Sequence, residues 1–172
     1  MRLQPNTLIV VVGPTASGKT ALAIDLAKAV NGEIISADSM QIYRGVDIAT
    51  AKPTPEELAA VPHHLIGFLP MDRAFSVADY AELARKEIND ILSRGKVPVL
   101  CGGTGLYIKA IVDNVQYSEA ITGDEALRER LRQLAEREGN DALWRRLEAM
   151  DPETAKRIHP NNIGRVIRAI EV

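Results

Sequence analysis

The run Gly13-Pro-Thr-Ala-Ser-Gly-Lys-Thr20 fits the pattern G-x-x-x-x-G-K-[ST]. Glycines allow backbone conformations that are closed to residues with a Cβ, so that successive N–H groups can converge on one anion. Lys19 adds a full positive charge, and the Thr20 hydroxyl suits a Mg²⁺ ion. The pattern needs a strand before it and a helix after it, and residues 7–12 and 21–28 meet both requirements. This segment is therefore predicted to bind a diphosphate or triphosphate.

Asp38 follows the second predicted strand, residues 33–37, at its carboxyl end. In an open α/β sheet this edge is where ligands bind, close to the loop that follows the first strand. A carboxylate there could bind Mg²⁺ or act as a general base toward a bound nucleophile. Helix capping or loop hydrogen bonding by Asp38 and Ser39 is the alternative, and the residue types alone leave both open.

The apolar strand predicted at 97–101 lacks a feature common in phosphate-loop enzymes. Most ATPases and GTPases of this kind carry a strand that ends in an acid, which helps to hold Mg²⁺. Here the strand runs into Cys101 and Gly102 without a carboxylate, which weakens the case for an ordinary ATPase and leaves Asp38 as the substitute. The turn Gly102-Gly-Thr-Gly105 could bring Thr104 to the same ligand, although a glycine-rich turn by itself is more often unliganded.

Strands and helices alternate over the first two thirds of the chain. The expected strands are 7–12, 33–37, 64–68 and 97–101, and the expected helices are 21–28, 55–60, the segment between Ser76 and Gly95, and 106–112. This alternation predicts a parallel sheet that helices cover on both faces. His63 and His64 are adjacent, so that on a strand they point to opposite faces and are not expected to share a metal ion.

The composition restricts the class of protein. A length of 172 residues with 46% hydrophobic residues suits one domain, or one domain with a small appendage. A net charge of −2 means that any contact with nucleic acid must come from a local basic patch. Cys101 is the only cysteine, which excludes a disulfide, and we expect it to be a small buried hydrophobe. No signal peptide or membrane-spanning run is evident, so we expect a cytoplasmic protein without a membrane partner.

The character of the chain changes beyond about residue 113. Charged helices are expected at 124–138 and 141–150, with another after Pro160, and a solvated face is the simplest reading of most of their arginines. The last segment, 163–172, is an amphipathic helix without a C-cap, and we expect the chain to be cut inside this element.

Taken together, these segments resemble the tRNA dimethylallyltransferase (tRNA isopentenyltransferase) family. The matching stretches occur in family order: Gly13–Thr20, Ile35–Gly45, Asp47–Pro53, Pro62–Ile66, Gly102–Tyr107, Ile158–Asn162 and Arg165–Glu171. Many proteins share the phosphate loop, whereas Asp38-Ser-Met-Gln41 and Gly102-Gly-Thr-Gly-Leu-Tyr107 are far more specific. The resemblance implies an α/β, P-loop NTPase-like core with a parallel sheet flanked by helices at 1–113. It also implies a small helical tRNA-binding insertion at 114–160 and, at 161–172, the start of a helix that returns to the core, the rest of which is missing.

The activity implied by the resemblance is prenyl transfer. A dimethylallyl group passes from dimethylallyl diphosphate to the exocyclic N6 amine of the adenosine 3′-adjacent to the anticodon in tRNA, and diphosphate is released. The phosphate loop holds the diphosphate of the donor with Mg²⁺, and not ATP. Asp38 matches the general base of the family, Thr104 matches a threonine beside the reacting groups, and Lys19 stabilises the charge on the leaving diphosphate.

The same resemblance implies the binding residues. Those for the diphosphate are Gly13, Pro14, Thr15, Ala16, Ser17, Gly18, Lys19 and Thr20, with Thr20 as a Mg²⁺ ligand and Asp38 as a second candidate ligand. Those for the tRNA anticodon stem-loop are Asp38, Ser39, Met40, Gln41, Thr104, Arg128, Gly164, Arg165, Val166, Ile167 and Arg168. The target base must leave the anticodon-loop stack to be reached.

Three departures from the family pattern keep alternatives open. Ala49 stands where a glycine is common, Asn162 stands where many relatives carry Asp, and family members continue past Val172 with an arginine that acts on the diphosphate. One alternative is therefore an inactive fragment that binds diphosphate or RNA. The others are an adenylate (cytokinin-type) isopentenyltransferase and a P-loop small-molecule kinase. The motif His159-Pro-Asn-Asn162 and the basic helices favour tRNA over free adenylate, and a monomer is expected.

Overall fold

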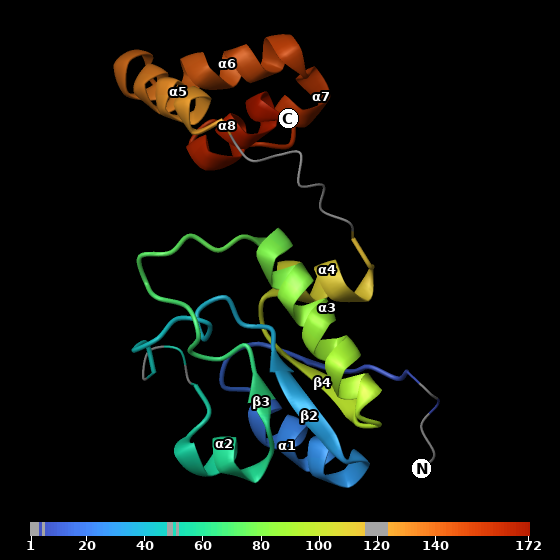
Figure 1. Cartoon of the computed structure of the whole chain (residues 1–172). Helices are drawn as coiled ribbons and strands as arrows, with labels where there is room; N and C mark the ends of the chain where they lie inside the picture. Colours follow the sequence, from blue (N-terminus) through green and yellow to red (C-terminus); the bar gives the residue numbers. More distant parts are fainter. Residues whose placement is uncertain (1–3, 5, 48–49, 51, 116–123) are drawn as a thin grey trace. The chain divides into compact units, whose positions relative to one another are not determined.

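The computed structural model describes residues 4, 6–47, 50, 52–115 and 124–172. The chain divides into two compact units, Met1–Tyr117 and Ser118–Val172. The first unit is an α/β layer structure and the second is helical (Figure 1). Ala49, where we noted a departure from the family pattern, lies outside the described residues.

A parallel sheet forms the centre of the first unit. Its strands are β1 (Ile9–Val12), β2 (Gly32–Ser36), β3 (His63–His64) and β4 (Val97–Gly102), in the order β1-β4-β2-β3. All three pairings are parallel, which confirms the predicted sheet. The helices of this unit are α1 (Lys19–Val30), α2 (Pro55–Ala60), α3 (Val77–Ser93) and α4 (Gly105–Val112).

Helices cover both faces of the sheet. Successive strand residues point to opposite faces, and the apolar side chains on each face pack against helices. Ile34 and Val99 pack with α1 in one apolar cluster. Their neighbours Ile35 and Leu100 pack with α3 and α4 in another. A strand that is buried on both faces reads as an apolar run without alternation, which explains why 97–101 was recognisable from sequence.

The strand predicted at 64–68 is wrong in extent. Only His63 and His64 pair with β2, and the chain then leaves the sheet. Leu65 and Gly67 adopt left-handed backbone conformations, with φ of 59° and 57°, and these interrupt extended pairing. The apolar pattern of the segment reflects packing of Leu65 against the core.

The carboxyl ends of β2 and β4 lie in direct backbone contact. Ala37 N donates to Cys101 O at 2.8 Å, and Thr104 N donates to Ala37 O at 3.0 Å. A Cβ on Gly102 would lie 2.1 Å from Ala37 O, so this position admits no side chain without a shift of the backbone. The contact brings the residues after Ala37 next to the turn that contains Thr104.

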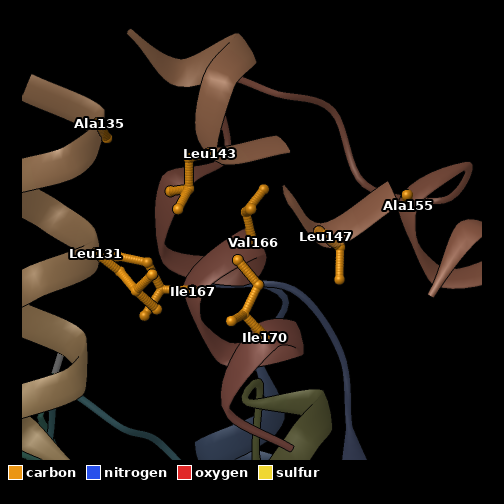
Figure 2. Close-up of a cluster of buried hydrophobic side chains, with 8 residues drawn as sticks. All are labelled: Leu131, Ala135, Leu143, Leu147, Ala155, Val166, Ile167 and Ile170. Carbon is orange, nitrogen blue, oxygen red and sulfur yellow. The ribbon is translucent and has the colours of Figure 1, made fainter. Parts of the chain in front are cut away.

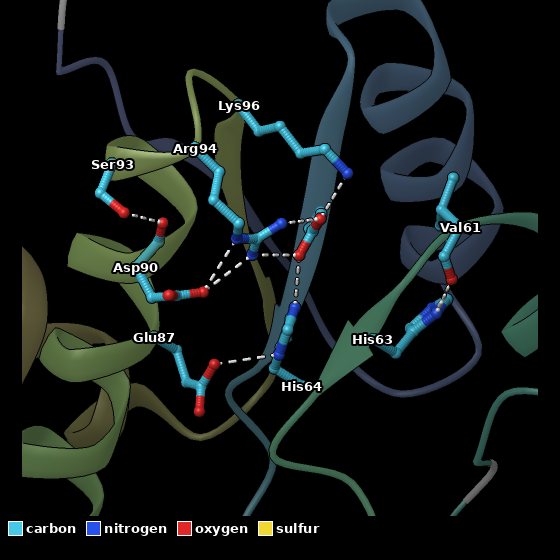
Figure 3. Close-up of polar contacts among 9 residues, drawn as sticks. Val61, His63, His64, Glu87, Asp90, Ser93, Arg94 and Lys96 are labelled. Atoms are coloured by element: carbon cyan, nitrogen blue, oxygen red, sulfur yellow. Dashed lines mark hydrogen bonds and ion pairs between the residues drawn. The ribbon is translucent and has the colours of Figure 1, made fainter.

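The opposite end of β2 carries a buried carboxylate, Glu33, whose side chain is 3% exposed. Arg94 donates to both of its oxygens, at 2.5 and 2.8 Å, and Lys96 donates at 2.6 Å (Figure 3). His64 Nε2 lies 2.7 Å from Glu33, and its Nδ1 lies 3.0 Å from Glu87. These partners, Arg94 foremost, hold the pKa of Glu33 far below its usual 4.5, although burial acts in the opposite direction.

The second unit is formed by α5 (Glu125–Glu138), α6 (Asn140–Met150), α7 (Pro152–Ala155) and α8 (Ile163–Glu171). Figure 2 shows their shared apolar core, which contains Leu131, Ala135, Leu143, Leu147, Ala155, Val166, Ile167 and Ile170. Trp144 Nε1 donates to Ile158 O at 2.7 Å and so ties the chain before α8 to α6. The helix expected at 161–172 to return to the α/β core is grouped with this unit, because Val166, Ile167 and Ile170 are packed into its core. Among the described helices, none is both long and apolar enough to cross a membrane.

We predict that Glu33→Gln destabilises the first unit by about 3 kcal/mol, because it leaves two cations without their shared carboxylate. The folded-state pKa of Glu33 is lowered, so its contribution is complete above about pH 4.5 and is lost as the pH falls below this value. The stability difference between Glu33→Gln and the unmodified chain, measured by urea unfolding, should therefore shrink below pH 4.5. Glu82→Gln, on the exposed face of α3, is the control and should change stability little. A difference that stays constant down to pH 2 would contradict the prediction.

We also predict that Gly102→Ala costs about 2–3 kcal/mol, because the added methyl group collides with the backbone of Ala37. The matched control is Gly105→Ala, since a Cβ at Gly105 meets nothing within 4 Å and this helical position gains up to about 1 kcal/mol from alanine. Chemical denaturation of the two variants measures both effects. Equal stabilities would show that the close approach of β2 and β4 is not required.

Candidate phosphate-binding and catalytic site

The loop between β1 and α1 has the conformation of a phosphate-binding turn. Gly18 has a left-handed φ of 80°, as predicted, and Ala16 also lies in this region with a φ of 62°. We expected Gly13 also to adopt a backbone conformation that is closed to other residues, but it is not left-handed. A Cβ there would lie 3.0 Å from Ser17 Oγ, so that the glycine makes room for the loop. The amino end of α1 then follows, with Lys19 and Thr20 in its first turn.

A cavity of about 220 Å³ lies over this loop. Its lining residues are Thr15, Ala16, Ser17, Gly18, Lys19, Thr20, Ala21, Asp38, Gln41, Thr50, Glu57, Cys101 and Gly102. The structure thus brings most of the predicted diphosphate residues and Asp38 to one space. Lys19 Nζ donates to Pro14 O at 2.8 Å, which folds the ammonium group over the loop. Positive charge and helix N–H groups on one side therefore face the carboxylate of Asp38.

The geometry of Asp38 is compatible with both of the roles that the sequence left open. Its Oδ1 accepts hydrogen bonds from Met40 N at 2.9 Å and Gln41 N at 3.4 Å, which is the local turn expected of a structural aspartate. The same side chain lines the cavity, and no described residue engages its second oxygen. A carboxylate held at one oxygen by backbone amides, with the other oxygen available, is oriented to accept a proton.

Thr104 contacts this turn, but it is not among the described residues that line the cavity. It occupies the position before α4, where a threonine usually caps the helix, yet its side chain does not cap. Its Oγ1 instead accepts from Ser39 N at 2.9 Å and donates to Ser39 Oγ at 3.3 Å. Thr104 therefore holds the segment after Asp38 in place, a bond across 65 residues that the sequence pattern did not reveal.

Two stacked tyrosines support the segment from the α3 and α4 side. The rings of Tyr80 and Tyr107 are 3.9 Å apart and 6° from parallel. Tyr80 donates its hydroxyl proton to Ser36 O at 2.9 Å, two residues before Asp38 in the chain. Burial raises the pKa of both tyrosines, so that the Tyr80 hydroxyl stays protonated as a donor.

Several cavity residues were not predicted as site residues. Cys101, expected to be buried, is half-buried on the cavity wall, and its burial raises the pKa of the thiol. Thr50 and Glu57 also line the cavity. The spacing Thr54-x-x-Glu57 predicts a capping box, and the structure contains it. This signal predicts where α2 begins, but it does not predict that α2 lies beside the phosphate loop.

The described residues could bind Mg²⁺ only together with a phosphate ligand that supplies further oxygen atoms. No group of three or more His, Cys, Asp or Glu side chains among them is placed to hold a metal ion. Mg²⁺ keeps several waters and commonly uses one or two carboxylates with substrate phosphates. The Thr20 hydroxyl and the Asp38 carboxylate, which line the same cavity, fit that requirement.

Of the remaining residues predicted to bind RNA in the first unit, Met40 is 51% exposed. Ser39 is half-buried against Thr104. Gln41 is engaged, since it accepts from Ser36 Oγ at 3.2 Å and donates to Thr50 O at 3.1 Å. Gln41 thus connects the end of β2 with the cavity wall.

In the second unit, two predicted RNA-binding arginines share a buried acid. Arg128 Nε lies 2.9 Å and Arg168 NH1 lies 2.6 Å from Glu171, whose side chain is 4% exposed. Hydrogen bonds from Arg128 and then Arg168 lower the pKa of Glu171. Both guanidinium groups therefore have a structural partner and are held in fixed positions on the unit surface.

The run 164–168 separates into buried and exposed members. Val166 and Ile167 are 0% and 5% exposed in the helical core, so their side chains cannot serve as the RNA contacts that the resemblance implied. Gly164, Arg165 and Arg168 are exposed, and Arg165 and Arg168 line one hollow with Asp151. No described acid pairs with the guanidinium of Arg165, which is therefore the one of these two arginines with a free charge.

A family model and several curated proteins match this chain. The family model described as IPP transferase matches residues 41–172. The tRNA dimethylallyltransferase of Bacillus cytotoxicus is 51% identical over 98% of this chain and 53% of its own length, and that of Bacillus subtilis is 53% identical over 96% and 52%. The chain thus spans about half the length of the curated relatives it matches.

Solved structures give the same result. The full-length tRNA isopentenylpyrophosphate transferase of Bacillus halodurans is 49% identical, with a TM-score of 0.65 over 96% of this chain and 55% of that one. A eukaryotic dimethylallyltransferase acting on tRNA is 30% identical, with a TM-score of 0.77 over 94% and 40%. A phosphate loop, an aspartate on its cavity wall and these likenesses lead to one conclusion: the chain belongs to the IPP transferase family.

Proposed function

We propose that this chain carries the donor site and part of the RNA-binding surface of a tRNA dimethylallyltransferase. In the reaction, the N6 amine of an adenosine beside the anticodon attacks the allylic carbon of dimethylallyl diphosphate. The carbon–oxygen bond breaks, diphosphate leaves, and one proton is lost from the amine. The observation that carries the proposal is the cavity in which Asp38 faces the phosphate loop.

The loop side of the cavity suits a leaving diphosphate. Negative charge grows on the bridging oxygen as the bond breaks, and Lys19 with the helix N–H groups would stabilise that charge. Mg²⁺ held by Thr20 and the diphosphate, with Asp38 as a further candidate ligand, would supply additional positive charge. A strand acid of the ATPase type is unnecessary here, which is consistent with the end of β4 at Gly102.

The opposite wall suits a proton acceptor. Aromatic amines are poor nucleophiles, and a carboxylate that takes the proton as the new bond forms lowers the barrier. The hydrogen bonds to Oδ1 of Asp38 orient the side chain, while Thr104 fixes the neighbouring backbone through Ser39. Thr104 therefore acts here as a positioning residue, and a direct contact with the reacting groups stays a prediction.

The RNA side of the proposal is carried by exposed groups. Met40 lies beside Asp38 and is available to a base that has left its stack. In the second unit, Arg165 and the partly exposed Arg128 and Arg168 offer cations to a phosphate backbone. A cytoplasmic, monomeric enzyme with Mg²⁺ as its cofactor remains part of the proposal.

The alternatives make different products, so one assay separates them. The 172-residue chain, and a version with the length of its relatives, would be incubated with an anticodon stem-loop, dimethylallyl diphosphate and Mg²⁺. Mass spectrometry should then show one added dimethylallyl group on the adenosine. Prenylation of AMP alone would favour the adenylate-type enzyme, transfer of the γ-phosphate of ATP would favour a kinase, and binding without product in either length would favour an inactive fragment.

Asp38→Asn tests the general base, because the amide oxygen can still accept from Met40 N and so keep the turn. We expect turnover to fall about 10²–10⁴-fold; pyrophosphate binding should change little if Asp38 acts as the base alone and should weaken if Asp38 also holds Mg²⁺. Initial rates in the protein length that turns over, with calorimetry for pyrophosphate, measure the two effects. Asp25→Asn on the exposed side of α1 is the control. Activity within tenfold of the unmodified protein would remove Asp38 as the base.

Arg165→Gln tests the RNA surface. Because Arg165 has no acid partner among the described residues, its loss should weaken stem-loop binding without destabilising the helical unit. The slope of log affinity against log salt should become smaller by about one. Arg145→Gln, another exposed arginine without a described partner, is the matched control. Equal effects of the two variants would indicate nonspecific attraction only.

A further inference from the structure

His63 is a buried hydrogen-bond acceptor that no step of the proposed reaction uses. Its Nδ1 lies 2.8 Å from Val61 O. A carbonyl oxygen can only accept, so Nδ1 must carry a proton, and in the neutral ring Nε2 is then an acceptor. Figure 3 shows His63 turned toward Val61, while the next residue, His64, reaches the Glu33 cluster on the other face, as expected for neighbours on a strand.

The acceptor of His63 has no partner in the described part of the chain. Nε2 is shielded from solvent and makes no hydrogen bond there. Buried polar atoms of this kind are nearly always satisfied in folded proteins, so a donor is expected within reach. The Glu33 cluster cannot provide it, because its cations lie on the opposite face of the strand.

A small cavity connects His63 to a donor. His63 lines a space of about 20 Å³ whose other polar lining residues are Thr20, Ser36, Gln41 and Cys101. Ser36 already donates to Gln41, the Gln41 amide donates to Thr50 O at 3.1 Å, and the thiol of Cys101 faces Lys19 O at 3.8 Å. The Thr20 hydroxyl, in contrast, makes no hydrogen bond to a described residue. The space has room for about one water, and both side chains line it, so that one water can bridge them.

This cavity adjoins the phosphate-binding space, since Thr20, Gln41 and Cys101 line both. We propose that His63 is a positioning residue of the phosphate loop, and that a single water in the small cavity accepts the proton of the Thr20 hydroxyl and donates one of its own to Nε2 of His63. With its proton held on the β3 side, the hydroxyl presents its lone pairs to the phosphate side, where a Mg²⁺–diphosphate ligand would lie. The consequence for Mg²⁺ rests on the proposed function, whereas the His63–Thr20 pair itself does not.

The pair is tested first without ligand. Thr20→Val and His63→Leu each remove one partner, and urea unfolding of both variants, the double variant and the unmodified chain forms a double-mutant cycle. A bonded pair should give a coupling of about threefold or more in the folding equilibrium constant. Thr20→Ser retains the hydroxyl and should preserve most of the coupling to His63→Leu. Additive effects of Thr20→Val and His63→Leu would overturn the proposal, whatever the ligand does.

The same variants test the positioning role through pyrophosphate binding at saturating Mg²⁺. His63→Leu should weaken binding about tenfold, as loss of a group that orients a metal ligand typically does. Thr20→Val should weaken it as well, and His63→Leu should have no further effect in the Thr20→Val protein. A separate tenfold loss in that background would mean that His63 acts through something other than Thr20. If the unmodified chain fails to bind pyrophosphate, the proposed function fails, and the unfolding cycle still decides the pair.

Discussion

The approach of the Ala37 and Gly102 backbones is the constraint on which the site depends. The pairing of β2 with β4 ends at Ser36 and Cys101, and the two chain segments could diverge beyond that point. They stay together because Ala37 bonds to Cys101 and Thr104 while Gly102 leaves no side chain between them. Asp38 and Thr104 come from segments 66 positions apart in the sequence, and this contact places them beside one another. The orientation of the Asp38 carboxylate follows from the resulting turn.

The two ends of β2 have contrasting electrostatic roles. At the amino end, Glu33 is buried and surrounded by Arg94, Lys96 and His64, so its charge is neutralised by a closed set of partners. At the carboxyl end, Asp38 is half-buried with backbone donors at one oxygen, and it faces an open cavity. A carboxylate that is fully paired stabilises the fold, whereas one with a free oxygen can exchange a proton or bind a cation. One strand thus separates a fully paired acid from the acid for which we propose a chemical role.

Local patterns predicted the parts of this protein that local physics decides. The phosphate loop, the capped starts of α2 and α3, and the buried strand β4 all depend on neighbours within a few residues. Two expectations changed when the structure was known. The apolar run 64–68 resembled a strand, but left-handed residues end the pairing after His64. The family resemblance implied that Val166 and Ile167 bind RNA together with Arg165 and Arg168. Val166 and Ile167 instead lie on the buried face of α8.

The sequence by itself predicted an anion site at Gly13–Thr20, and it determined that strands and helices alternate and that Asp38 follows the end of a strand. These conclusions follow from residue types and spacings, because backbone conformation and the apolar period are local properties. Tertiary structure decided which side chains share the cavity with the loop, including Glu57 and Cys101. It also decided that Thr104 bonds to Ser39 instead of capping its helix, and that Glu171 engages Arg128 and Arg168. Such pairings depend on distances between segments far apart in the chain, and those distances are set only when the sheet and the helical core are packed.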